Sequence, residues 1–195
     1  MPTVRLDSPA SPIGYAEQRD FMRLATDDEQ PLVEELLLAA SAWLTRETNV
    51  ALLDTAHRLE LARFPRCREI ELWPVPLASV ASVVYDDADG VEQSLDAAAY
   101  TVDYARLPAR LVLKRGQSWP ATAGEPGSVR ITYSSGHGTA DRVPAELRAA
   151  VRLMAAHLFE NREPAAPVAM SEVPMALQRI VELHRFPNPD PEPED

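Results

Sequence analysis

The sequence is poor in the residue types that mark several common classes of protein. Among its 195 residues Cys67 is the one cysteine, so an intramolecular disulfide is excluded. No apolar run approaches the roughly 20 residues of a membrane-spanning helix, and the first residues, MPTVRLDSPASP, have no apolar signal-peptide core. We therefore expect a soluble protein that is made in a reducing cytoplasm and contacts no membrane.

Motifs for phosphate, metal and calcium binding are also lacking. The sequence has no Gly-rich phosphate loop, and no two of its 4 histidines have the spacing of metal ligands on a helix. The acidic stretch 85–90 is not followed by the bidentate Glu that a calcium loop requires. We therefore expect no metal or other cofactor.

Basic residues are outnumbered as well. Asp and Glu total 30 against 19 Lys and Arg, which gives a formal net charge of −11. A protein that binds nucleic acid by neutralising phosphates needs the opposite balance. Such a charge is still compatible with a protein that DNA passes without sticking.

The residues that are present form a core-building composition with helical periodicity toward both ends. Hydrophobic residues make up 46% and charged residues 25%, which fits one domain, or one domain with a sizeable insertion. Apolar residues at helical spacing predict helices over 15–25, 28–47, 144–162 and 174–184.

The middle of the chain alternates between apolar and polar residues with a period of two. This pattern, from Thr55 to Ser135, predicts about six antiparallel strands in a single sheet, and Asp89-Gly90 predicts a hairpin turn. The expected fold class is α+β: mainly a helical bundle, with two long core helices and short flanking helices, and an antiparallel β insertion between them. The expected parts are an extended N-terminal arm (1–14), the bundle (15–54 and 139–185), the β insertion (55–138) and an acidic, Pro-rich C-terminal tail (186–195).

The stretch YSSGHG, 133–138, holds the main candidates for catalysis. Ser134, Ser135 and His137 are the residue types of a nucleophile and its base, but the Gly-x-Ser-x-Gly elbow of serine hydrolases is missing. We interpret Gly136 and Gly138 as the turn between a strand and a helix. Two alternatives stay open: an enzyme based on these residues, and a small-molecule or peptide-binding β module with helical flanks.

Four segments, taken in order, carry a resemblance to a known family. They are PLVEELLLAASAWLTRETNVALL (31–53), ELWPVPLASVASVVYDDADGVEQSLDAAAYTVD (71–103), GQSWPAT (116–122), and VRITYSSGHG (129–138) followed by VPAELRAAVRLMAAHLFENRE (143–163). Their order over residues 27–185 resembles the head-tail connector (adaptor) family of long-tailed bacteriophages and phage-like gene transfer agents. The resemblance does not cover the first fourteen residues or the tail after Arg185.

The resemblance implies a structural protein of a virion or of a gene transfer agent particle, and not an enzyme. Such proteins form a ring, expected to be dodecameric, below the portal protein of the DNA-filled head. The ring extends the DNA channel and provides the platform for the next tail-side protein, a stopper or head-completion protein. The implied location is the neck of the particle, after assembly in the host bacterial cytoplasm, with DNA passing through the lumen without specific binding.

Three sets of residues are expected to make the contacts of such a ring. Arg148, Arg152 and Phe159 lie away from the main apolar stripe of the helix at 144–162, so we expect them to face a neighbouring subunit. By analogy with the family, the portal is expected to contact Leu183, His184, Arg185, Phe186, Pro187, Asn188 and Pro189. The tips of the β insertion are expected to contact a partner through Asp87, Asp89, Gly90 and Trp119. Trp119 and Trp73 each precede a proline, and whether they cap the sheet or anchor a partner stays open.

Overall fold

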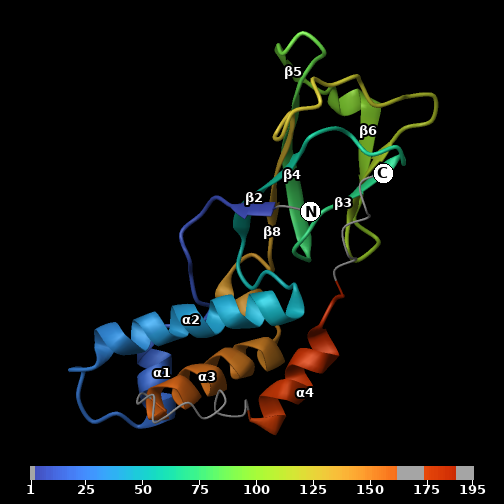
Figure 1. The fold of residues 1–195 in the computed structure, drawn as a ribbon. Coiled ribbons are helices and arrows are strands. Elements are labelled where there is room, and N and C mark those ends of the chain that lie inside the picture. The colour runs from blue at the N-terminus through green and yellow to red at the C-terminus, as the bar shows by residue number, and fades with distance from the viewer. Residues whose placement is uncertain (1–2, 162–173, 188–195) are drawn as a thin grey trace, which may run out of the picture. The chain divides into compact units, whose positions relative to one another are not determined.

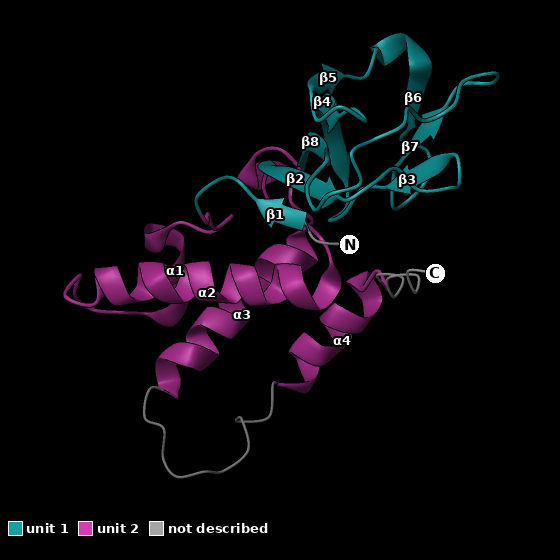
Figure 2. Cartoon of the chain, turned by 45° about the horizontal axis from the view of Figure 1, so that its top comes forward, with its two compact units in different colours: residues 1–8, 54–136, 189–195 teal, residues 9–53, 137–188 magenta. Residues whose placement is uncertain are grey.

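The computed structural model describes residues 3–161 and 174–187, which form two compact units (Figure 2). Residues 3–8 and 54–136 form the first, here called the β unit. Residues 9–53, 137–161 and 174–187 form the second, here called the helical unit.

The β unit contains two antiparallel sheets. The larger sheet has the strand order β1-β2-β8-β4-β5, and the smaller has the order β3-β7-β6 (Figure 1). The strands of the first are β1 (Thr3–Arg5), β2 (Thr55–Leu61), β8 (Val129–Ser135), β4 (Leu77–Asp86) and β5 (Glu92–Ser94). Those of the second are β3 (Glu69–Glu71), β7 (Arg110–Leu113) and β6 (Tyr100–Asp103).

Strand β8 is the centre of the larger sheet, with β2 on one side and β4 on the other. Its alternation places Val129, Ile131 and Tyr133 in the core, because successive side chains of a strand point to opposite faces. Tyr133 is almost fully buried, and its hydroxyl donates a hydrogen bond to the backbone carbonyl of Trp73. The smaller sheet adds Leu111 and Ile70 to the same core.

The helical unit is built on the pairing of α2 (Gln30–Thr48) with α3 (Ala145–Glu160). Buried residues recur at helical spacing on both helices. Ala40 and Ala150 are both fully buried, and their small side chains allow the two helices to pack closely. Helices α1 (Tyr15–Met22) and α4 (Met175–His184) contact this pair (Figure 1). The stripe on α2 is Val33, Leu37, Ala40 and Leu44, and that on α3 is Leu147, Ala150, Val151 and Met154.

The chain turns from β8 toward α3 at two glycines. Gly136 has φ 142° and Gly138 has φ 86°, a region of backbone conformation that side chains with a Cβ rarely adopt. A short 3-10 turn, Ala140–Arg142, then leads into α3. The prediction that Gly136 and Gly138 form this turn is confirmed.

The predicted fold class is wrong: the chain is not a mainly helical bundle carrying one inserted sheet. The β unit has two sheets and a core of its own, and the N-terminal segment adds β1 to the larger sheet. Periodicity shows which face of a strand is buried but not which strand is its partner. Pro74 and Pro76 lie between β3 and β4, where a proline cannot donate a backbone hydrogen bond to a sheet. The strands on either side of them belong to different sheets.

Candidate functional site

The serines considered for catalysis are part of the sheet. Ser134 and Ser135 end β8, and their side chains point to opposite faces. Ser135 pairs with Thr55 on one side and Leu77 on the other and is fully buried, so its hydroxyl is not accessible to a substrate. His137 follows in the loop, where its backbone N–H donates to the carbonyl of Leu52 at 3.3 Å. Ser135 is therefore a structural residue.

Two of the three residues expected at the subunit interface contact α1 of their own chain. Arg148 Nη2 lies 2.8 Å from Glu17 Oε1, and Arg152 forms an ion pair with the same carboxylate. The next residue of α1, the fully buried Gln18, donates its side-chain amide to the backbone carbonyl of Arg152 at 3.1 Å. One carboxylate thus serves two guanidinium groups, and the polar contacts hold α1 against α3.

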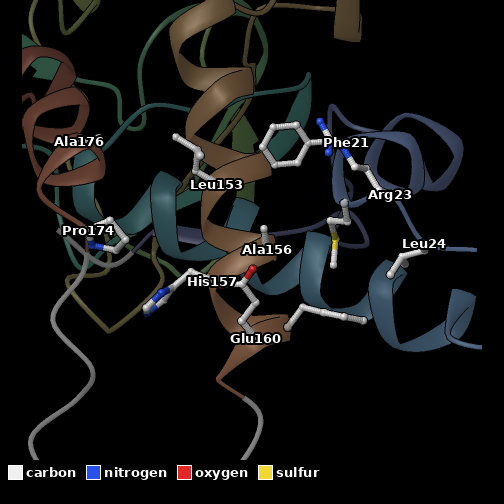
Figure 3. A pocket seen from close by; sticks show the side chains of 11 residues that line it. Phe21, Arg23, Leu24, Leu153, Ala156, His157, Glu160, Pro174 and Ala176 are labelled. Carbon is white, nitrogen blue, oxygen red and sulfur yellow. The ribbon is translucent and has the colours of Figure 1, made fainter.

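Phe159, the third of these residues, is among the residues that line a pocket in the helical unit. Figure 3 shows this pocket from close by. The pocket has a volume of about 500 Å³ and lies over α3, bordered by the end of α1 and the start of α4. Its lining is mainly apolar, with Arg23, His157 and Glu160 as its charged or titratable members. The expectation that Arg148, Arg152 and Phe159 face another subunit stays a prediction. Apolar lining residues include Phe21, Leu24, Leu153, Ala156 and Pro174.

The segment expected to contact the portal begins at a fixed point of the helical unit. The backbone N–H of Phe186 donates to the carbonyl of Thr48 at 2.9 Å, and the amide of Asn49 donates to the carbonyl of Phe186 at 2.7 Å. His184 Nε2 lies 2.7 Å from Glu146 Oε2. Leu183 is 65% exposed, and Arg185 and Pro187 are also exposed, whereas Asn188 and Pro189 lie outside the described residues.

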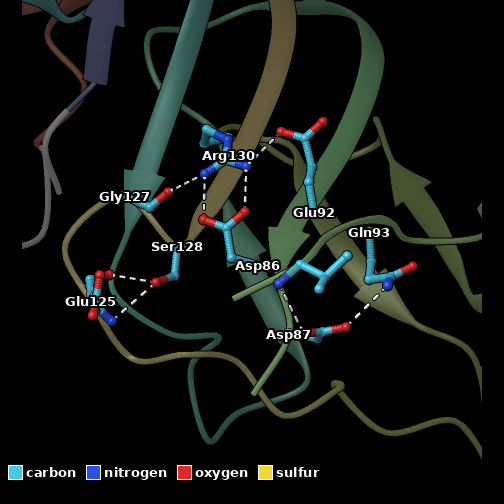
Figure 4. A network of polar contacts seen from close by, with 9 residues as sticks. Asp86, Asp87, Glu92, Gln93, Glu125, Gly127, Ser128 and Arg130 are labelled. Carbon is cyan, nitrogen blue, oxygen red and sulfur yellow. Dashed lines mark hydrogen bonds and ion pairs between the residues drawn. The ribbon is translucent and has the colours of Figure 1, made fainter. Parts of the chain in front are cut away.

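The hairpin between β4 and β5 is confirmed, and Asp87 organises its tip (Figure 4). One Asp87 carboxylate oxygen accepts from the backbone N–H groups of Asp89 and Val91, both at 3.0 Å, and the other accepts from Gln93. These bonds, led by the one from Val91, lower the pKa of Asp87. Gly90 has φ 77°, as a tight turn requires. Asp89 and Gly90 are exposed, so a partner can reach them.

Arg130 joins this hairpin to the centre of the sheet. Its guanidinium makes two hydrogen bonds of 2.8 Å to the carboxylate of Asp86, and a third of 2.9 Å to Glu92 (Figure 4). It also donates to the backbone carbonyl of Gly127 at 2.7 Å. The hydrogen bonds from Arg130 lower the pKa of Asp86, because they favour its charged form.

Trp119 packs against the core of the β unit. Its ring stacks on Phe64 with centroids 4.7 Å apart, and its indole N–H donates to the carbonyl of Cys67 at 2.8 Å. The sheet-capping interpretation of Trp119 therefore has direct support, while its contact with a partner stays a prediction.

The described residues 3–161 and 174–187 contain no group of three or more His, Cys, Asp and Glu side chains able to hold a metal ion. No helix within these ranges is both long and apolar enough to cross a membrane.

Comparison with known proteins gives matches among solved structures. No protein-family model matches the chain, and no curated protein matches it. A chain in the neck of an empty gene transfer agent (GTA) particle, computed with C6 symmetry, is 28% identical, with a TM-score of 0.79 over 96% of this chain and 97% of that one. The chain is a structural relative of a GTA neck protein. Its resemblance to the head-tail connector family is confirmed.

Two further GTA structures agree with this neck match. A chain of the virion of a native GTA particle is 26% identical with a TM-score of 0.78, and a chain in the neck of a native GTA particle, computed with C12 symmetry, is 26% identical with a TM-score of 0.74. Both matches cover 96% of this chain and 97% of the other. These relatives support a structural protein of the particle neck and of a phage-like particle.

Sequence reasoning missed the residues that tie the parts of this neck protein together. Glu17 and Phe21 lie on a short helix whose role periodicity did not reveal. Asn49 carried a usable signal, because an Asn directly after a helix often adopts the left-handed conformation that ends it, and its φ here is 58°. Arg130 carried none, since a charged residue on the polar face of a strand is ordinary.

Proposed function

We propose that this chain is a head-tail connector, one subunit of a twelve-membered ring below the portal of a phage-like particle. The ring extends the DNA channel and gives the next tail-side protein, a stopper or head-completion protein, its platform. The observation that carries the proposal is the match to GTA neck chains, which spans 96% of this chain and 97% of the relatives.

The ring is supported by the symmetry applied to the related necks. One neck was computed with C6 and another with C12 symmetry, which are the symmetries of closed rings. A cyclic ring uses two different surfaces of each subunit, because its contacts are head-to-tail. Twelve copies fit both symmetries.

The charge of the chain suits a channel that DNA crosses. A formal net charge of −11 on each subunit, repeated around a ring, gives a field that repels duplex phosphates. We expect no measurable binding of a DNA duplex at moderate salt by fluorescence anisotropy. Micromolar binding would contradict a channel that only conducts DNA.

The C-terminal segment is the proposed portal contact. Thr48 and Asn49 hold the main chain at Phe186, which fixes the start of this segment in the helical unit. The sequence that follows, PNPDPEPED, alternates proline with other residues and carries only acidic charge. Such a segment loses little conformational entropy when it docks in an extended form.

Native mass spectrometry of the chain mixed with the portal ring from the same genome tests the function. We expect one connector bound per portal subunit, and loss of binding when residues 186–195 are deleted. A matched control replaces the acidic residues of the tail, Asp190, Glu192, Glu194 and Asp195, with Asn or Gln and keeps its length and prolines. Absence of any complex with the full chain would reject the connector and favour the ligand-binding β module.

A further inference from the structure

The pocket over α3 leaves large apolar side chains in contact with solvent. Phe21 is 45% exposed and Leu153 is 36% exposed, and both line it. Figure 3 shows Ala156 of α3 between the side chains contributed by the end of α1 and by Pro174 and Ala176 at the start of α4. A floor of small and aliphatic residues between two helices has the form of a groove that accepts another helix.

Helix α2 has an exposed face whose centre, like the groove, is lined by small and apolar side chains. Positions Glu34, Glu35, Leu38, Ala39 and Ala42 are exposed and lie opposite the buried stripe of the helix. Leu38 is 37% exposed and stands between two alanines and two acids. The centre of this face is therefore small and apolar.

The two faces lie on opposite sides of the α2–α3 pair. The helices pack through their buried stripes, so the exposed side of each points away from the other. On α3, Leu153, Ala156 and Glu160 are at helical positions outside the stripe that meets α2. Opposed faces of different shape are what a head-to-tail ring contact requires.

The charges of the faces are complementary. The groove is lined by Arg23, which is exposed, while the face of α2 carries Glu34 and Glu35. Glu34 already accepts a hydrogen bond from Gln30 at 2.8 Å, which leaves Glu35 as the acid better placed for a partner. Glu160 in the groove and the exposed Arg46 toward the end of α2 also carry opposite charges, although Arg46 already lies 3.8 Å from Glu47 of its own helix.

We infer that the groove between α1 and α4 receives the exposed face of α2 from a neighbouring copy of the chain. The inference rests on the proposed ring and names the surfaces that close it. It places the contact on Leu153 and Ala156, rather than on Arg148 and Arg152, whose guanidinium groups are already bound to Glu17.

Cysteine cross-linking on the portal ring tests the contact. In a Cys67→Ser background, Leu38→Cys and Ala156→Cys are combined in one chain, bound to the portal and oxidised. We expect a ladder of covalent multimers extending beyond the dimer. Each single variant is the matched control, because one cysteine per chain yields a dimer at most.

A charge exchange provides a second, independent readout. Arg23→Glu and Glu35→Arg are each expected to lower the number of connectors bound per portal at least tenfold, and the double variant to restore it. Circular dichroism melting of each variant checks that the exposed substitutions leave the fold intact.

The outcomes separate the inference from the function. The portal could be fully occupied while no ladder forms and neither charge reversal has an effect. This result would overturn the α2–groove contact but would remain consistent with the connector function. Failure of the wild-type chain to bind the portal would reject both.

Discussion

The contacts that stabilise the β unit internally differ from those that stabilise the helical unit. In the β unit, strands distant in sequence pair across two sheets, and large side chains such as Ile131 and Tyr133 fill the core. In the helical unit, α2 and α3 form a pair, whereas α1 is attached by the Glu17 contacts and α4 by Leu177, Val181 and the Glu146–His184 pair. From this comparison we expect the β unit to unfold as one cooperative block, and α1 and α4, which frame the groove, to open more readily than the α2–α3 pair.

Ile131→Ala should produce the largest effect. Ile131 is fully buried at the centre of the β unit, and its truncation leaves a cavity that costs about 2–5 kcal/mol of unfolding free energy. Urea denaturation followed by circular dichroism measures the loss. Thr132→Ala, next along the same strand on its other face, should cost under about 1 kcal/mol. Equal effects of the two would show that the β unit has no dominant core.

The pH dependence of the β unit should come next. Burial, followed by the charge of Arg5, lowers the pKa of His57 from 6.5 to about 4, while Asp7 opposes the shift. The unfolded chain therefore binds a proton in this range that the folded chain does not, so stability is complete above pH 6.5 and falls as pH drops toward 4, by about 2–3 kcal/mol.

The matched comparison for this titration is His57→Gln. Its unfolding free energy should depend less on pH between 7 and 4 than that of the wild type, because the carboxylates common to both chains cancel in the difference. Parallel pH profiles of the two chains would mean that His57 is not held neutral by burial.

Arg130→Met should loosen one end of the β unit. The substitution keeps most of the aliphatic stem but removes the bonds to Asp86, Glu92 and Gly127. We expect faster amide hydrogen exchange in the β4–β5 hairpin and a smaller loss of global stability than with Ile131→Ala. Arg58→Met, which removes the 3.3 Å ion pair with Glu60 on the same strand, is the control and should leave the hairpin unchanged.

Glu17→Gln should change the global unfolding free energy least, and its effect should be confined to α1. Removing the carboxylate leaves Arg148 and Arg152 without their shared counter-charge, at a cost of about 1 kcal/mol because the group is partly exposed. Amide exchange in α1 should accelerate while α2 and α3 stay protected. Glu35→Gln on the exposed face of α2 should change neither. Uniform acceleration through all four described helices would remove the distinction between the firm pair and its attached helices.

The elements themselves were largely readable from the sequence. Apolar stripes located α2 and α3 to within two residues, because a helix buried on one face repeats its pattern regularly. Alternation located the strands from β2 to β8, and Asp89-Gly90 marked the hairpin. Strand β1 was missed, since three residues with exposed Val4 carry too little pattern.

The arrangement of these elements in space could not be predicted from the sequence. Division into two sheets depends on which strands pair, and pairing over long separations leaves no local signature. The expected contact sites were chosen from helix faces and loop tips, so the sequence indicated that Arg148 and Arg152 lie off the main stripe. It could not reveal that Glu17, over 130 positions earlier, supplies their partner.

Arg130 also acts as a cross-link. Its bonds to Asp86 and Glu92 close chain segments of 44 and 38 residues, and restricting such segments removes conformations that the open chain would otherwise sample. A disulfide would join such segments covalently and also constrain the unfolded chain, whereas the Arg130 contacts act only in the folded state; a chain whose one cysteine is Cys67 has no intramolecular disulfide. The guanidinium link is indifferent to reductants and reversible, and the lowered pKa of Asp86 preserves it until the solution becomes strongly acidic.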